Sequence, residues 1–478
     1  MAQHVHELEP GIRRLTTPHL VFMIIAASAP LTVLAGGVPT NFAVSGLLGV
    51  PVAYLVLGIL IAIFAFGYGA MSTRIQNAGA FYAYISKGLG DRVGVASSLV
   101  ALLCYNLMQI GLYGLFGFAL SGALASVTPL VLPWWTTALL GWFCVGLLGI
   151  RHVELSARIL TVLVALEFLV VAVVCALGLT HAPEGISTIT LRPGDFFTGG
   201  VGVLLAFGIA AFMGFESGAI YSEETIDPDR TVSRATFIAV GIIALFYAFS
   251  AWAFSMGIGP SGIIDSSREF GPDLMFVWLE DFSPAFSLLS SFLFITSLFA
   301  ALIAFHNAAA RYAFALGRAW VLPKVFGKIS HDGTPHVGSL GQSVLAFTVI
   351  VIFAGADTMN GNTPLFPVIT LFTWLTNTAA LGLVILLSLT SFAIARHLGR
   401  GEQVLGLWTR CIAPIVSGIG LALIGLLVLL NFSLMIGDDQ PAMLTFILPG
   451  LIVAAAFAGV IRQKQLLDTT GVNHVEIP

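Results

Sequence analysis

The sequence predicts an all-α polytopic membrane protein with twelve transmembrane helices. Of its 478 residues, 58% are hydrophobic and only 9% are charged, whereas a soluble domain carries about 25% charged residues. A helix needs about 20 mostly apolar residues to cross a bilayer. Twelve such runs lie near 20–42, 47–70, 94–123, 131–150, 159–180, 199–221, 236–259, 284–316, 338–356, 366–395, 409–436 and 442–461.

The distribution of basic residues supports this count and orients the chain. With an even number of spans and the N-terminus inside, every Lys and Arg except Arg192 and Arg268 falls in a cytoplasmic segment or an adjoining helix end. This asymmetry follows the positive-inside rule. The polar start of the chain also lacks the apolar core of a signal peptide. We therefore expect cytoplasmic tails at 1–19 and 462–478 and an integral protein of the cytoplasmic (inner) membrane.

The first predicted span carries a proline near its centre. Pro30 follows four small residues, AASA, and precedes the pair Gly36-Gly37. A proline inside a helix lacks an amide proton and clashes with the preceding turn, so we expect the helix to break here. The small neighbours let the freed backbone approach a ligand. A simple packing kink is the alternative.

The sixth predicted span is weak in its middle for a different reason. Small residues interrupt its apolar run at Gly208, Ala210, Ala211 and Gly214. Unwound backbone at membrane depth is tolerated only where it is buried in protein or lines a wet cavity. Two breaks, in the first spans of successive groups of five, are typical of an inverted-repeat transporter. The expected divisions are a first repeat at 20–180, a second repeat at 199–395 and two further spans at 409–461.

Three stretches resemble the amino acid–polyamine–organocation superfamily. They are GFESGAIYSEETIDPDRTVSRAT (214–236), NAGAFYAYISKGLGDRVG (77–94) and the basic step from Arg151 to Arg158. The resemblance covers roughly residues 17–400 and is most specific after the sixth span. It implies the five-plus-five inverted repeat (LeuT-type fold), with substrate held between broken helices 1 and 6.

The resemblance also implies a function: a secondary active transporter that imports an amino acid by alternating access. A polyamine or other organic-amine permease or exchanger of the same fold is the alternative. AASAPLTVLAGG replaces the usual Gly-Ser-Gly type run of the first span and looks closer to the polyamine and actinobacterial-type amino acid permeases. Ala210 and Ala211 stand where relatives often carry an aromatic gate.

The predicted substrate site follows from the two breaks. An amino acid brings a carboxylate and an ammonium into a low-dielectric place, where unpartnered charges are costly. Free amides at half-helix ends suit the carboxylate, and unwound carbonyls suit the ammonium. Two polar residues on one face of the third span are further candidates, although interhelical hydrogen bonding is their alternative role. The candidates are Ala27, Ser28, Ala29, Leu31, Thr32, Tyr105, Gln109, Phe207, Ile209 and Ala210.

Three ionisable residues inside the spans are candidates for coupling or gating. Glu167 lies near the place where several relatives carry a lysine, and proton coupling or contact with a substrate amine competes with structural pairing. Glu216 is expected in the first turn of a half-helix that restarts at Gly214, where a carboxylate is favourable; it is a cap, a gating or proton-sensing group, or both. His306 is a third candidate, although a lone histidine in a helix is more often a structural group.

The sequence predicts neither an enzyme nor a metal protein. The four cysteines lie in apolar runs without metal or redox spacing, and the spans show no nucleophile–base set. We expect no catalytic residues, no cofactor and no nucleic acid partner. The predicted driving ion is H+, with Na+ as the alternative. The expected partners are a small-molecule substrate and the lipid bilayer, and the expected state is a monomer or homodimer.

Overall fold

The computed structural model describes residues 16–72, 74–75, 80–150, 157–196, 198–216, 225–329, 335–359, 361–400, 405–437 and 440–470. These residues are almost entirely helical, as the sequence predicts. Among them, nine helices are long and apolar enough to cross a membrane. They are α3 (Val50–Ser72), α5 (Asp91–Val127), α7 (Ala157–Thr180), α11 (Pro228–Ile258), α14 (Pro284–Arg318), α15 (His336–Met359), η6 with α16 (Val368–Phe372 and Thr373–Arg400), η7 with α17 (Trp408–Ile412 and Ala413–Leu430) and α19 (Leu444–Thr470).

The remaining three predicted spans are shorter or interrupted. The fourth is α6 (Trp134–Ile150), which has 17 residues, and the sixth begins with α9 (Val201–Phe212), which has 12. The first span is divided into α1 (Thr17–Ser28), the π-helical turn η1 (Thr32–Gly37) and α2 (Val38–Ser45). Helix length alone therefore does not give twelve crossings, and that number and the repeat boundaries stay predictions.

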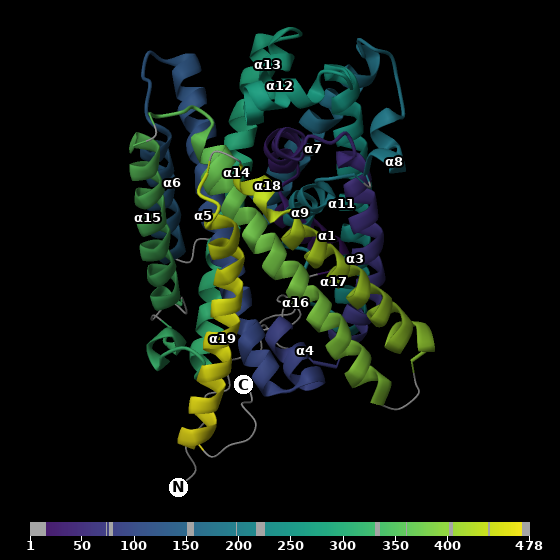
Figure 1. The fold of residues 1–478 in the computed structure, drawn as a ribbon, viewed down its shortest axis with the longest axis vertical. Helices are drawn as coiled ribbons and strands as arrows, with labels where there is room; N and C mark the ends of the chain where they lie inside the picture. Colours follow the sequence, from purple (N-terminus) through teal and green to yellow (C-terminus); the bar gives the residue numbers. More distant parts are fainter. Residues whose placement is uncertain are drawn as a thin grey trace.

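Segments far apart in the sequence pack side by side in one bundle (Figure 1). Helix α3 packs along α11, α5 packs along α14 and α19, and α6 pairs with α15 at one edge. Small residues permit the closest approaches: a Cβ added at Gly58 on α3 would lie 2.2 Å from the Ala244 side chain on α11. Such small-residue contacts are typical of helices that associate inside a membrane.

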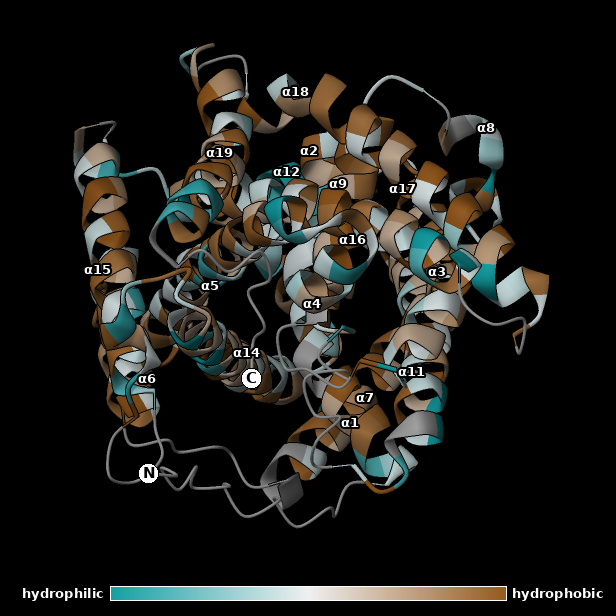
Figure 2. Ribbon diagram, turned by 90° about the horizontal axis from the view of Figure 1, so that it is seen from below, coloured by the Kyte–Doolittle hydropathy of each residue, from teal (hydrophilic) through white to brown (hydrophobic). Residues whose placement is uncertain are grey.

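The outer faces of the bundle are apolar, as Figure 2 shows for the helices at its periphery. Phe143 on α6 is 60% exposed, Phe446 and Val453 on α19 are 77% and 69% exposed, and Leu245 on α11 is 67% exposed. A contiguous apolar surface of this kind needs a nonpolar surrounding. The described surface therefore suits a lipid bilayer.

The two ends of the bundle carry opposite charge. At one end lies α4 (Ala80–Leu89), together with the C-terminal ends of α16 and α19 (Figure 1). We call it the basic end after the residues Lys87, Arg92, Arg318, Lys324, Arg396, Arg400, Arg462 and Lys464.

The opposite end is capped by α12 (Ile263–Phe270), η4 (Gly271–Asp273) and α13 (Leu274–Glu280) (Figure 1). Two other short helices, α8 (Pro193–Phe196) and α18 (Phe432–Ile436), belong to other parts of the chain. We call α12, η4 and α13, with the residue that follows them, the acidic cap. Its acids are Asp265, Glu269, Asp273, Glu280 and Asp281, and its one base, Arg268, lies 3.4 Å from Asp265.

Candidate functional site

The first span breaks where its proline predicts. Helix α1 ends at Ser28, and Ala29 adopts a left-handed conformation with φ 47°. Leu31 lies in the first turn of the helix that resumes at Pro30, so its amide is left without a helical acceptor. It donates instead to Oε2 of Glu167, at 3.1 Å, from helix α7. Glu167 is only 4% exposed, so this contact is a buried cap on a broken helix.

The sixth span breaks at Gly214, which has φ 111°. Helix α9 ends at Phe212, and the residues as far as Glu216 form turns. The Gly214 amide donates to Oε2 of Glu216 at 2.9 Å, and the Tyr105 hydroxyl of α5 donates to Oε1 at 3.0 Å. Glu216 is 2% exposed. The side chain thus caps the break itself. The half-helix that is predicted to restart at Gly214 would continue through residues 217–224, which lie outside the described residues.

Hydroxyl groups tie the first break to neighbouring helices. The Tyr247 hydroxyl of α11 is 2.9 Å from both the carbonyl and the hydroxyl oxygens of Ser28. On the far side of the break, the hydroxyls of Thr32 and Ser297 lie 3.0 Å apart. Helices α7, α11 and α14 therefore all make polar contacts to this break, which fixes its position within the bundle.

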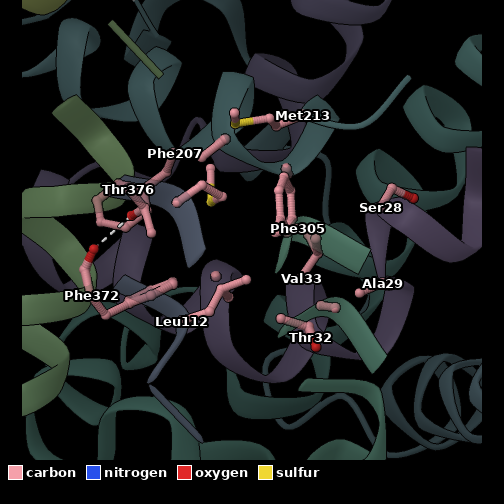
Figure 3. Close-up of a pocket in the computed structure, with 15 residues that line it drawn as sticks. Ser28, Ala29, Thr32, Val33, Leu112, Phe207, Met213, Phe305, Phe372 and Thr376 are labelled. Carbon is pink, nitrogen blue, oxygen red and sulfur yellow. Dashed lines mark hydrogen bonds between the residues drawn. The ribbon is translucent and has the colours of Figure 1, made fainter. Parts of the chain in front are cut away.

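A pocket of about 60 Å³ lies between the two breaks (Figure 3). A cavity of this size has room for water. Its wall is mainly apolar, with three hydroxyl side chains. The lining residues are Ser28, Ala29, Thr32, Val33, Gly37, Met108, Leu112, Phe207, Ala210, Ala211, Met213, Ala301, Phe305, Phe372 and Thr376.

The structure brings together only part of the predicted substrate site. Among the nine predicted residues whose side chains the structure describes, five line the pocket and four do not. Those that line it are Ser28, Ala29, Thr32, Phe207 and Ala210. Of the others, Leu31 donates its amide to Glu167, Tyr105 binds Glu216, and Ile209 is buried outside the lining. The side chain of Ala27 lies outside the described residues.

Gln109 and His306 belong to a separate polar network. The Gln109 side-chain nitrogen lies 3.2 Å from Nδ1 of His306, and Nε2 of His306 lies 2.7 Å from the Ser339 hydroxyl. Gln342 donates to the Gln109 side-chain oxygen. This network joins α5, α14 and α15, and none of its members lines the pocket. The contacts fit the structural alternative for His306.

Most of the apolar residues that line the pocket are not among those predicted from the sequence. Met108 and Leu112 on α5, and Ala301 and Phe305 on α14, are each four residues apart, as neighbours on one helix face are. Phe372 and Thr376 have the same spacing, and the Thr376 hydroxyl donates to the Phe372 carbonyl at 2.7 Å (Figure 3). This spacing identifies a face of each helix but does not say which face meets the pocket.

No carboxylate is among the lining residues, and the described residues offer no metal site. Within the ranges that the structure describes, no three or more His, Cys, Asp or Glu side chains are grouped so that they could hold a metal ion. Glu167 and Glu216 instead lie behind the two breaks, each with its oxygen on a backbone amide.

An all-helical membrane bundle with two interrupted helices around a buried pocket is the architecture of a transporter. The comparisons with known proteins agree. The amino acid permease family model matches residues 19–468, and the chain belongs to this family.

The relatives include transporters of different solutes. The low-affinity putrescine importer PlaP of Escherichia coli K12 is 27% identical, over 72% of this chain and 77% of that protein. The lysine-specific permease LysP of the same organism is 23% identical, over 78% and 76%. A crystal structure of the Eremococcus coleocola manganese transporter covers 98% of this chain and 99% of that one, with 16% identity and a TM-score of 0.53. This last likeness concerns the fold.

Proposed function

We propose that the protein imports an amino acid across the cytoplasmic membrane by proton-coupled secondary transport. The observation that carries this proposal is the pocket between two broken helices, each with a buried carboxylate on a freed amide. In this mechanism two five-helix repeats, 20–180 and 199–395, alternate access to the pocket. Both termini lie in the cytoplasm, and the protein works as a monomer or homodimer.

The ends of α1 and α9 supply the attraction for the substrate amine. Both helices end at the pocket with their C-termini, where each helix dipole presents its negative end. An ammonium group is favoured there without a carboxylate in the wall. The substrate carboxylate is favoured at the opposite side of the break, where the outer part of the first span begins.

The apolar wall supports a substrate with an apolar side chain. Met108, Leu112, Phe207, Phe305 and Phe372 would exclude water from such a side chain. The small volume favours a short one. A second ammonium group at this wall would be left without a charged partner, which is costly.

A polyamine or other organic amine is the second candidate. The two carboxylates behind the pocket and the relation to a putrescine importer favour it. The acidic cap would also attract a cation from outside by its field. A panel of radiolabelled amino acids and putrescine, tested in proteoliposomes, separates the two candidates.

Proton coupling is tested by imposing a pH gradient or a sodium gradient on the same proteoliposomes. We expect accumulation of substrate with an inward proton gradient, and its loss when a protonophore is added. Accumulation driven by sodium alone would contradict the proposal. The driving ion is independent of substrate identity, so the two results are read separately.

The two buried carboxylates are the proposed coupling groups. We expect Glu167→Gln and Glu216→Gln to retain substrate binding but to flatten the dependence of uptake on pH between about pH 5 and about pH 8, because a carboxamide does not ionise in this range and cannot take up or release the coupled proton. Glu280→Gln, an exposed acid of the acidic cap, is the control and should keep the original profile. An unchanged profile in both pocket-side variants would rule out these residues as coupling groups.

A further inference from the structure

A second cavity, of about 320 Å³, opens at the basic end. Three segments form it: the turn after α3, the C-terminal end of α4 and the C-terminal end of α16. Its lining residues are Arg74, Lys87, Gly88, Arg396, His397 and Arg400. Four of these six residues are permanently or normally cationic, and the pocket between the broken helices shares no residue with it.

A close backbone contact fixes the arrangement of these side chains. A Cβ added at Gly88 would lie 2.3 Å from the carbonyl oxygen of Ala393 and 2.4 Å from its Cα. Only glycine therefore allows α4 to touch α16 at this depth. The contact holds Lys87, the neighbour of Gly88, against the helix turn that carries Arg396 and His397. The cationic groups converge because two rigid helices meet.

The positive charge of the cavity is not balanced within the described part of the chain. Among the described residues, none of Arg74, Lys87, Arg396 and Arg400 has an acidic partner, and the ion pair of Arg268 with Asp265 lies at the opposite end of the molecule. The C-terminal dipoles of α4 and α16 favour nearby cations, but each is equivalent to only about −0.5 charge. Two such ends offset about one of the four cations. Because the remaining charges repel one another, an anion would stabilise the cavity.

The basic cavity lies near the level of the membrane surface. Trp408 on η7 is 46% exposed, Phe66 on α3 is 40% exposed, and their ring centroids lie 6.4 Å apart. The turn η7 packs on α16. A half-exposed tryptophan at the end of an apolar span is typical of the membrane–water interface, which is the depth of phospholipid headgroups.

We propose that this cavity binds a phosphate group, carried by an anionic phospholipid headgroup or by a soluble phosphate. Arginine offers paired donors that match phosphate oxygens, and lysine adds a point charge. Basic pockets between transmembrane helices on the cytoplasmic side recognise phospholipid headgroups in this way. A phosphate here bridges α4, α16 and the turn after α3. The site is separate from the substrate pocket and does not depend on which solute is carried.

The test uses the purified full-length chain and its thermal unfolding midpoint. In the lipid arm, neutral detergent micelles receive phosphatidylglycerol or, as the uncharged reference, phosphatidylcholine. In the soluble arm they receive inorganic phosphate at matched ionic strength. A ligand that binds the folded state raises the midpoint with its concentration. Stabilisation by phosphatidylglycerol alone assigns the site to a lipid headgroup, and stabilisation by inorganic phosphate assigns it to a soluble anion.

Matched variants localise the effect to the cavity. The double variant K87Q/R396Q removes one cation from each helix, and we expect the concentration needed for half of the stabilisation to rise about fivefold per cation, or about 25-fold. The variant K87R/R396K keeps the charge and should keep most of the response. The control K328Q/K464Q removes two exposed cations from outside the cavity and should respond as the unmodified protein does.

Two results would overturn the proposal. One is the absence of stabilisation by either phosphate source in the unmodified protein. The other is an equal loss in K87Q/R396Q and K328Q/K464Q, because that indicates attraction to general surface charge and not to this cavity. Each double variant's midpoint without added phosphate shows that its fold is intact.

Discussion

At the first break the carboxylate of Glu167 reaches the Leu31 amide from 136 residues away, whereas at the second break Glu216 accepts from Gly214, two residues away. Both carboxylates are almost fully buried, and each accepts from an amide that the break frees. Glu216 also accepts from the Tyr105 hydroxyl of α5. In both breaks a buried carboxylate therefore accepts from a freed amide. At the first break the carboxylate comes from another helix, and at the second it comes from the same turn.

The difference shows how each break depends on the rest of the bundle. The geometry of the second break is set locally, because Gly214 can adopt φ 111° and its own chain supplies the cap. The first break is complete only when α7 packs against the first span. A movement of α7 relative to the first span would thus release an amide at the first break but not at the second.

Removing the carboxylates of Glu167 and Glu216 tests the comparison of the two breaks most directly, and the largest effect on stability is expected here. Glu216→Ala leaves two buried donors, the Gly214 amide and the Tyr105 hydroxyl, each costing about 1–3 kcal/mol. We expect a loss of about 2–6 kcal/mol in the free energy of unfolding, the sum for the two donors. Glu167→Ala leaves the Leu31 amide and should cost about 1–3 kcal/mol. Reversible unfolding in bicelles measures both.

The control for these truncations is Glu280→Ala, which removes an exposed carboxylate of the acidic cap. A change within about 0.5 kcal/mol is expected for it. If Glu167→Ala lowers the free energy of unfolding more than Glu216→Ala does, the prediction is wrong, because the loss of one hydrogen bond to Leu31 cannot explain the larger cost.

A medium effect is expected from the backbone conformations at the breaks. Gly214→Ala places a side chain at φ 111° and should cost about 1–3 kcal/mol. Ala29→Gly relieves the left-handed strain at φ 47° but adds freedom to the unfolded chain, so the net change should lie within about 0.5 kcal/mol of zero. The same unfolding measurement applies.

Gly199 is the matched control because it has open space around its Cβ position and no positive φ. Gly199→Ala should be neutral or stabilising by up to about 1 kcal/mol. If Gly214→Ala is equally neutral, the second break does not depend on a glycine.

The smallest effect is expected in the acidic cap and separates stability from transport. Burial raises the pKa of Asp273 from 3.8 to about 6. Between these values the unfolded state releases a proton that the folded state keeps, so this residue makes the protein less stable as pH rises through the interval. Asp273→Asn should therefore raise the unfolding midpoint at about pH 7 and leave it unchanged below the unfolded-state pKa.

Uptake in the Asp273→Asn variant should keep its dependence on pH, because this residue lies outside the breaks. A flattened uptake profile would instead assign part of the pH response to the acidic cap and weaken the role proposed for Glu167 and Glu216. If the difference in unfolding midpoint between Asp273→Asn and the unmodified protein is the same at every pH, the raised pKa of Asp273 is contradicted.

Much of the fold can be predicted from local sequence. The apolar runs predict helices because backbone groups in a bilayer must bond within their own segment. Pro30 predicts the first break because it removes an amide donor, and Gly214 marks the second because it tolerates a left-handed backbone. These are properties of single residues and their immediate neighbours, and the structure has both breaks where the sequence predicts them.

The side chains that bind to the two breaks cannot all be predicted from the local sequence. The sequence predicts Glu167 as an acid inside a span, but its bond to Leu31 depends on how α7 packs. The sequence also makes His306 a candidate for coupling, and only the packing of α5, α14 and α15 shows its network with Gln109 and Ser339. The basic cavity depends likewise on the contact of Gly88 with Ala393.

The sequence by itself therefore determined the membrane class, the helical character and the positions at which two helices are interrupted. Each of these follows from hydrophobicity, from the covalent structure of proline or from the conformational freedom of glycine. Only the tertiary structure decided which carboxylate caps which break, which apolar faces enclose the pocket and which cations meet at the basic end. Those features join residues that are far apart in the chain, and their energies depend on distances that only packing sets.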